Sequence, residues 1–340
     1  MFKKIIATIL CLSFALPITA FAEEVNIYSA RKEKLIKPLL DQFSEATGIK
    51  VNLVTGKADA LLKKLELEGD NTPADVLITV DAGRLYRAQQ AGVLQPVEST
   101  VLTESIPENL RDPENHWFGM TYRSRPIFYV KGKVKAEELS TYEALTDEKW
   151  QRRICIRSSN NIYNQSLVAS MLATQGAEKT QAWVNDFVKN FARPPKGGDR
   201  DQLKAAAAGQ CDIAIANSYY YAAMLSGKDE EQKAVAEKMA IFWPNQGEND
   251  RGAHINISGA AVTKAAKNKA NAIKLLEFMT QDEAQTWYSD VNGEYPVKSG
   301  IAASKLLQSW GEFKADALNL SELGSHNAEA LKMMDKAGWK

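Results

Sequence analysis

The chain has 340 residues, equal numbers of basic and acidic side chains (42 of each) and 45% apolar residues. That apolar share is ordinary for a globular protein, and the length suggests two domains of about 100–200 residues each. Because the charge is near neutral and is not clustered, nucleic acid and anionic lipid are disfavoured as the main partner.

The first 22 residues have the pattern of a secretory signal peptide. Lys3 and Lys4 precede an apolar run over residues 5–16, and Ala20-Phe21-Ala22 supplies a small-x-small cleavage site. The run is too short to span a membrane, and Cys11 lacks the small preceding residue of a lipoprotein signal. A buried N-terminal helix is the alternative. We expect cleavage after residue 22 and a periplasmic product, more negative by the two lost lysine charges.

The mature chain opens with alternating strand and helix patterns. Apolar runs predict strands over residues 25–29, 49–54 and 75–80. Periodic stretches predict helices over residues 32–46, 58–68 and 83–90. Gly48 is a natural helix stop, and Pro38 lies early enough in its helix to be tolerated. This alternation predicts a parallel sheet with helices on both faces.

The alternation resumes after Tyr122. Strands are predicted over residues 154–157, 212–216 and 259–262, and helices over residues 165–174, 178–190, 200–208, 268–280 and 281–289. Strand-like pieces beside prolines, at residues 121–126 and 241–246, are the expected crossings between two lobes. Two crossings make each lobe discontinuous, with a ligand in the cleft at the carboxyl ends of the strands.

The lobe boundaries follow from those crossings. We assign residues 23–123 and 246–300 to the N-terminal lobe, and residues 124–245 and 301–340 to the C-terminal lobe.

The mature chain keeps Cys155 and Cys211, which could pair in an oxidising compartment. Each lies at a predicted strand, so the two could be neighbours in one sheet; two buried free thiols are the alternative. With only His116, His254 and His326, a zinc cage or a Cys/His nucleophile pair has little material. A Gly-x-Ser-x-Gly elbow and a Walker loop are also absent from the sequence, so a carrier is favoured over a periplasmic hydrolase.

Two strand ends lead into helices through Ser and Asn residues, which are preferred N-caps. These junctions, residues 158–164 and 217–221, place Tyr163, Tyr219 and Tyr220 in first helical turns, at the face where ligands bind. A helix N-terminus carries partial positive charge, which favours an ionised phenol or a bound anion.

Tyrosine binds a metal at neutral pH only if the metal displaces its proton, because the free phenol has a pKa of about 10. A hard trivalent cation does this. Three phenolates would balance Fe³⁺ and fill half of an octahedron, and a small bidentate anion could fill further positions. Arg31, Arg123 and Arg125 lie at predicted lobe edges and could hold that anion. From the residues alone, packing aromatics, a sugar-stacking surface and ordinary interlobe ion pairs stay open.

The chain resembles the ferric ion-binding proteins of bacterial iron ABC transporters over essentially the whole mature sequence. The residues that carry the resemblance are Asn26-Ile27-Tyr28-Ser29-Ala30-Arg31, Pro73-Ala74-Asp75-Val76, Tyr122-Arg123-Ser124-Arg125, Gly198-Asp199-Arg200-Asp201-Gln202, Asn256-Ile257-Ser258-Gly259 and Asn217-Ser218-Tyr219-Tyr220. The last motif is the most specific, because its adjacent tyrosines bind iron in this family. Tyr163 matches the family's third tyrosine, whereas Tyr221 matches no ligand position.

The resemblance implies a type II periplasmic-binding-protein fold, similar to a transferrin lobe, with two α/β lobes, a hinge and an interlobe cleft. It also implies Fe³⁺ as the cargo and an arginine-held synergistic anion, often carbonate or bicarbonate. The implied partners are an inner-membrane ABC permease and its ATPase, and we expect a monomer.

The chain departs from the family pattern in the N-terminal lobe. Many relatives have a histidine, and some a tyrosine, where this chain has Lys32, Glu33 and Lys34, and some use a glutamate where it has Val80. The N-terminal lobe therefore looks short of direct ligands, and Glu33 is a candidate substitute. A two-lobed receptor for an organic anion or a phosphorylated sugar, using the arginines and the helix N-termini, is the alternative function.

Overall fold

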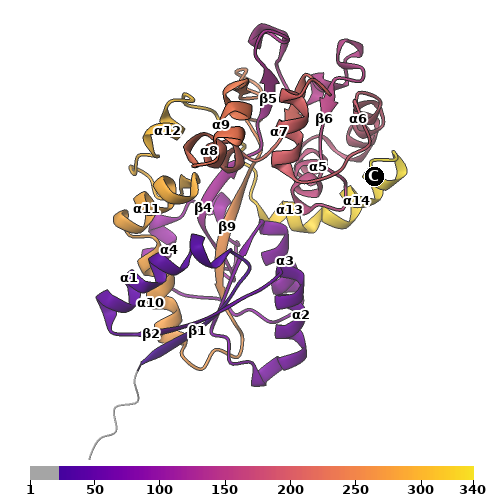
Figure 1. Ribbon diagram of the computed structural model, residues 1–340. Helices are drawn as coiled ribbons and strands as arrows, with labels where there is room; N and C mark the ends of the chain where they lie inside the picture. The colour runs from indigo at the N-terminus through magenta and orange to yellow at the C-terminus, as the bar shows by residue number, and fades with distance from the viewer. Residues whose placement is uncertain (1–22) are drawn as a thin grey trace, which may run out of the picture.

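The computed structural model describes residues 23–340, so the predicted signal peptide lies outside the described residues. Two lobes, each built on its own sheet, are joined by a narrower region that contains parts of β4 and β9 (Figure 1). None of the helices described between residues 23 and 340 is long and apolar enough to cross a membrane.

In the described part of the chain, the sheet of the first lobe has six strands in the order β10-β4-β9-β3-β1-β2. Their bounds are β1 (Glu24–Ser29), β2 (Lys50–Thr55), β3 (Val76–Val80), β4 (Phe118–Ser124), β9 (Ile255–Val262) and β10 (Tyr295–Pro296). The three N-terminal strands predicted from sequence are confirmed.

The predicted parallel sheet is confirmed for the three N-terminal strands but does not extend to the other strands of this lobe. β1 pairs in parallel with β2 and β3, whereas β9 is antiparallel to both β3 and β4. The reason is topological, because β4 leads out towards the second lobe and β9 is the strand that returns from it.

Helices cover the first sheet, because their apolar faces pack on its buried strands. Their bounds are α1 (Lys37–Thr47), α2 (Ala58–Glu68), α3 (Ala82–Gln90), α4 (Thr100–Ser105), α10 (Lys269–Met279) and α11 (Asp282–Asn292). α1 begins later than predicted, since Pro38 occupies its first turn, where a missing N–H costs nothing. Gly48 ends α1 with a φ of +73°, as expected.

The second lobe has a four-stranded sheet in the order β6-β7-β5-β8, counted over the described residues. Its elements are β5 (Ile127–Val130), β6 (Ile154–Cys155), β7 (Ile213–Ile215), β8 (Met239–Phe242), α5 (Ile162–Gln175), α6 (Ala177–Lys189), α7 (Asp199–Ala207), α8 (Ser218–Ser226) and α9 (Glu230–Glu237). β6 and β7 are shorter than predicted. The predicted helices α5, α6 and α7 are confirmed, although α5 begins three residues earlier.

Short 3₁₀ helices fill several connections: η1 (Glu33–Leu35), η2 (Gly69–Asn71), η3 (Glu108–Leu110), η4 (Ala136–Glu138), η5 (Glu143–Thr146) and η6 (Glu148–Trp150).

Within residues 23–340 the chain passes between the lobes three times, where the sequence predicted two crossings. The links β4–β5 and β8–β9 correspond to the predicted ones. The third is the C-terminal segment, with α12 (Lys305–Gln308), α13 (Ser321–Ser325) and α14 (Asn327–Lys336). Leu323 belongs to the first core, whereas Met334 and Trp339 belong to the second. The predicted division of the chain at residues 124, 246 and 301 stays a prediction.

The predicted disulfide is present. β6 and β7 are parallel neighbours, which brings Cys155 and Cys211 to a Cα–Cα distance of 5.9 Å, with a bond between their sulfurs. Both side chains are buried. The bond therefore links two strands whose helices carry the predicted ligands.

Replacing both cysteines with alanine should lower the free energy of unfolding by about 2–4 kcal/mol, because the bond closes a loop of 56 residues in the unfolded chain. Guanidinium unfolding of the oxidised proteins measures the loss. Reduced wild type is the control, and it should match the double variant. Equal midpoints for oxidised wild type and the variant would contradict the expectation.

Candidate functional site

Three tyrosines gather at the starts of two helices. The Asn161 side chain caps α5 by accepting from the Tyr163 backbone N–H at 3.1 Å, and α8 begins directly after Asn217. The Tyr219 hydroxyl donates to the Tyr163 hydroxyl at 3.1 Å. The Tyr219 and Tyr220 rings lie 4.4 Å apart between centroids. The structure therefore brings together the three tyrosines singled out in the sequence.

The next tyrosine in the run takes a different place. Tyr221 is buried and donates its hydroxyl hydrogen to the Met239 carbonyl at 3.0 Å. Its ring packs on Phe128 and Trp310. Tyr221 is thus a packing residue of the second lobe.

Tyr219 and Tyr220 hold their protons firmly in the absence of a cation. Burial raises the pKa of Tyr219 well above 10, and the neighbouring Tyr163 and Tyr220 raise it further. Burial also raises the pKa of Tyr220, to about 12. Arg123 opposes the shift at Tyr219 by stabilising a phenolate. Only a strong nearby positive charge would ionise this cluster at neutral pH.

Arginine side chains surround the tyrosines. The guanidinium carbons of Arg123, Arg125 and Arg157 lie 5.6, 6.0 and 5.5 Å from the centroid of the Tyr163 ring. The guanidinium of Arg200 lies 5.2 Å from the Tyr220 centroid. The cluster therefore sits in a positive environment that favours phenolates and further anions.

Arg125 holds the helix starts together. Its Nη1 donates to Asp199 at 2.9 Å and to Asn217 at 2.8 Å, and its Nη2 donates to Asn164 at 2.7 Å. Asp199 also accepts from the Asn217 backbone N–H at 2.7 Å and pairs with Arg157 at 3.2 Å. Both terminal nitrogens of Arg125 thus have protein partners, although the sequence singled it out as an anion-binding residue.

Arg123, unlike Arg125, makes no side-chain hydrogen bond to the described residues. Its side chain is 2% exposed, yet its Nε and both terminal nitrogens lack hydrogen-bond partners among the described residues. Asp81 is 3.8 Å away. Since unpartnered buried donors are costly, a guanidinium left in this state fits an anion-binding role.

A small cavity adjoins this guanidinium. It measures about 10 Å³, which is room for roughly one water molecule. The lining residues are Asp81, Arg123, Ser124, Arg125, Tyr163, Asn217, His254 and Asn256, from both lobes and the crossing strands. Burial lowers the pKa of His254 well below its usual value, and nearby arginines lower it further, so this imidazole adds no charge at neutral pH.

The first lobe faces the cluster with an ion pair. Arg31 donates to Ser258 at 2.6 Å and pairs with Glu294 at 3.0 Å. Burial acts to lower the pKa of Arg31, but the Glu294 carboxylate together with Tyr288 and Tyr219 raises that pKa overall. Thr121 donates to the same carboxylate at 2.6 Å. The predicted candidate Glu33 is instead exposed in η1, without a side-chain hydrogen bond or ion pair among the described residues.

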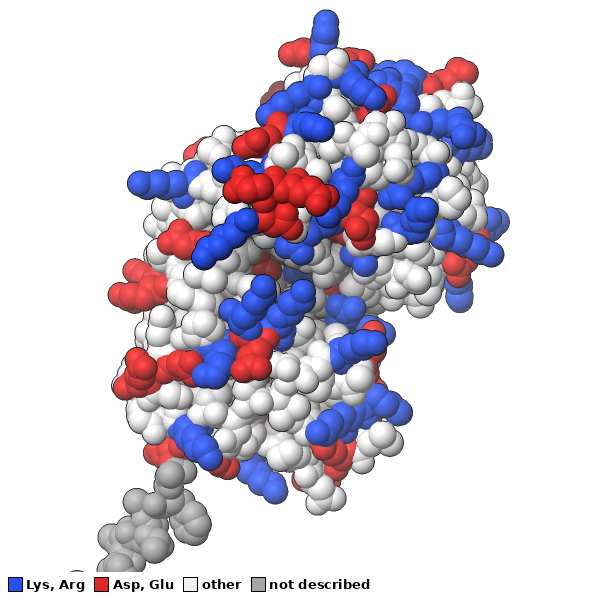
Figure 2. All heavy atoms as spheres, in the orientation of Figure 1, with Lys and Arg blue, Asp and Glu red and all other residues white. Residues whose placement is uncertain are grey.

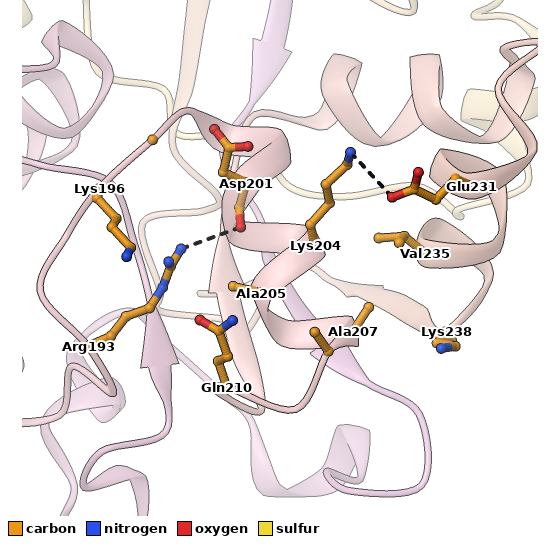
Figure 3. Close-up of a pocket in the computed structure, with 12 residues that line it drawn as sticks. Arg193, Lys196, Asp201, Lys204, Ala205, Ala207, Gln210, Glu231, Val235 and Lys238 are labelled. Carbon is orange, nitrogen blue, oxygen red and sulfur yellow. Dashed lines mark hydrogen bonds and ion pairs between the residues drawn. The ribbon is translucent and has the colours of Figure 1, made fainter.

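A larger pocket lies elsewhere. About 600 Å³ in volume, it opens on the second lobe between α7, α9 and the loop that carries Arg193 and Lys196 (Figure 3). Its charged side chains are mixed in sign, and Lys204 approaches Glu231 at 3.8 Å. None of the predicted site residues lines this pocket.

Basic and acidic side chains are interspersed over the face drawn in Figure 2, and the surface is hollowed between the two lobes. This agrees with the expectation of an unclustered surface.

Comparison with known proteins agrees with the architecture. Residues 39–315 match the family described as bacterial extracellular solute-binding proteins. The chain belongs to this family. Iron uptake protein A1 of Synechocystis sp. is 49% identical over 318 residues, which span 94% of this chain and 88% of that one.

Solved structures give the same result for this solute-binding protein. A Trichodesmium protein in complex with iron and citrate has a TM-score of 0.91 and 51% identity, covering 93% of this chain and 100% of that chain. Ferric iron-binding protein A of Mannheimia haemolytica, in an open conformation, has a TM-score of 0.87 and 43% identity. The match covers 94% of this chain and 99% of that chain. The predicted two-lobed fold and the resemblance to ferric ion-binding proteins are confirmed.

The sequence missed several residues that organise the site of this solute-binding protein. Three buried carboxylates bind side chains that are 74 or more residues away along the chain. Asp81 accepts from Ser166, Asp199 from Arg125 and Glu294 from Arg31. Asp199 lay within a motif of the family resemblance, but its role could not be read from that motif. Glu294 gave no signal beyond its place before Tyr295 and Pro296.

Replacing Arg125 with methionine should lower the free energy of unfolding by about 3–5 kcal/mol, because it breaks a buried ion pair and leaves Asp199 with fewer donors. The matched Arg123→Met change should cost less, since it breaks no protein hydrogen bond. Urea unfolding of the metal-free proteins measures both losses. Equal losses would contradict the contrast drawn between the two arginines.

Proposed function

We propose that this protein is a periplasmic carrier that captures ferric iron with Tyr163, Tyr219 and Tyr220. One observation carries the proposal: hydroxyl groups from two separate helix starts converge, with Tyr219 and Tyr163 in contact at 3.1 Å. A packing role alone does not require the hydroxyls of Tyr219 and Tyr163 to meet, with the Tyr220 ring packed beside them. The arginines around them favour the phenolate forms that a hard trivalent cation prefers.

The proposed coordination leaves positions on the iron that an anion can fill. Three phenolates neutralise Fe³⁺ but supply half of an octahedral shell. Arg123, with buried nitrogens that lack partners among the described residues, is the group proposed to hold a bidentate anion there. Arg31 and Arg125 were also predicted for this role. Because Glu294 and Asp199 already bind them, we propose that these two arginines contribute positive charge near the anion without binding it directly.

A small anion suits this site better than a large one. The cavity beside Arg123 has room for roughly one water molecule, so carbonate or bicarbonate requires a smaller displacement of its lining residues than citrate does. Iron together with citrate is what the Trichodesmium structure contains. For this chain we propose carbonate as the synergistic anion, with citrate as the competing candidate.

The proposed role is transport and not catalysis. Closure of the lobes buries the cation and presents a liganded shape to an inner-membrane ABC permease, which its ATPase drives. The names of the relatives support this proposal, since they describe iron uptake and ferric iron binding.

Adding ferric citrate with bicarbonate to the metal-free protein should produce a visible phenolate-to-iron charge-transfer band. Tyr219→Phe or Tyr220→Phe should abolish or shift this band and weaken iron binding more than about 100-fold, since even outer-shell partners cost about 10–100-fold. Absorbance titration against a competing chelator measures both.

Tyr221→Phe is the matched control, because its hydroxyl bonds to Met239 and lies outside the cluster. It should keep the band and the affinity. A colourless protein that binds phosphate esters or organic anions without metal would contradict the iron proposal and support the alternative receptor.

Iron affinity should fall as the pH falls. The ordinary phenol pKa is about 10, and burial raises that of Tyr219 and Tyr220, so neutral metal-free protein holds protons that binding must release. Each phenol must release one proton to bind the metal, so each phenolate ligand lowers iron affinity about tenfold more for every unit by which the pH falls. Tyr220→Phe should therefore lower the slope of log affinity against pH by about one.

Competition titrations between about pH 6 and pH 8, where the phenols of the metal-free protein stay protonated because their ordinary pKa is about 10, measure that slope. The wild-type comparison cancels protons that come from the chelator and the anion. Equal slopes in the two proteins would contradict Tyr220 as a phenolate ligand.

A further inference from the structure

The first lobe touches the tyrosine helix at a glycine. Gly293 follows α11 and adopts a φ of +64°, in the left-handed region. A Cβ atom built there would lie 2.7 Å from the Ala222 Cβ and 3.8 Å from the Tyr219 Cα. Real Cβ atoms do not approach that closely, so the backbone of Gly293 and the side of α8 are in direct contact.

This contact joins the two lobes. α11 leads into β10, which pairs with β4 in the first sheet, whereas α8 follows β7 of the second sheet. Ala222 is buried in one cluster with Tyr295 and Leu307. The next residue, Glu294, holds Arg31, whose charge acts on Tyr219. The turn thus combines close packing against α8 with the ion pair that faces its tyrosines.

We propose that Gly293 is a positioning residue through which the first lobe sets the place of α8, and with it Tyr219 and Tyr220, in the iron-loaded closed state. This inference rests on the proposed iron-binding function. It also gives the first lobe a part in holding the metal, although this chain has Lys32, Glu33 and Lys34 where the family resemblance implied a histidine or tyrosine. In this proposal the first lobe contributes through the contact of Gly293 with α8 and supplies no metal ligand of its own.

The first test compares two glycines of the same backbone type. Gly293→Ala adds both left-handed strain and the clash with Ala222. Gly48→Ala adds the strain alone, because Gly48 has a φ of +73° and no atom within 4 Å of its Cβ position. The double variant Gly293→Ala with Ala222→Gly keeps the strain and removes the clash.

Overpacking by one methyl typically costs about 1–3 kcal/mol, and 1.4 kcal/mol corresponds to tenfold in affinity. Gly293→Ala should therefore weaken iron binding about fivefold or more and shift the charge-transfer band. Gly48→Ala should leave affinity and band unchanged. The double variant should return to within about threefold of Ala222→Gly alone, and the shift of the charge-transfer band, which a loss of stability alone would not produce, should disappear with it.

A second pair approaches the contact from the other side and avoids the strained glycine. Ala222→Val adds bulk towards Gly293, whereas Ala223→Val adds it to the exposed neighbour on the same helix. Iron affinity should fall at least about tenfold for Ala222→Val and stay unchanged for Ala223→Val. This pair decides the matter if Gly293→Ala does not fold.

Several outcomes would overturn the inference. Gly293→Ala that binds iron as tightly as Gly48→Ala, or a double variant that is not restored, excludes the contact as the cause. Ala222→Val and Ala223→Val with equal affinity do the same. A wild-type protein that never develops the band overturns the iron proposal itself, and this inference with it.

Discussion

The site depends on the ion pair between Arg125 and Asp199, which ties three helix starts to one point. Arg125 donates to Asn164 of α5 and to Asn217 at the start of α8, while Asp199 opens α7. Removing two charges from water is costly, and here the additional hydrogen bonds to both partners offset that cost. Because Tyr163 and Tyr219 lie within two residues of the tied positions, the same network fixes where their hydroxyls meet.

Charge balance explains why metal and anion belong together in the proposed function. Without a cation, burial keeps Tyr219 and Tyr220 neutral, and Arg123, Arg157 and Arg200 leave an excess of positive charge around the tyrosines. Three phenolates only cancel the charge of Fe³⁺, so the excess remains after the metal binds. An anion beside Arg123 reduces that excess and supplies oxygen ligands at the same time.

The sequence revealed the parts of the site that depend on local chemistry. N-cap preference placed the tyrosines in first helical turns, and apolar runs located the strands before them. The partners of Arg125, Arg31 and Asp81 lie far away along the chain, so their pairing depends on topology that no local pattern encodes. The third crossing was missed for a similar reason, because α13 is only five residues long. These pairings and the third crossing depend on contacts between residues far apart in the sequence, which local propensity does not encode.

The two lobes contribute unequally, and this bears on release. In the proposed coordination all three tyrosines belong to the second lobe, so no phenolate–iron bond joins the lobes. The lobe arrangement of this structure is instead held by contacts such as the Ser166 hydroxyl donating to Asp81 at 2.8 Å and α8 packing against Gly293. A hydrogen bond to a charged group is worth about 1.5–3 kcal/mol, and water can replace it once the lobes separate. A permease that separates the lobes therefore need not first break the coordination shell, and opening exposes the iron while the second lobe still holds it.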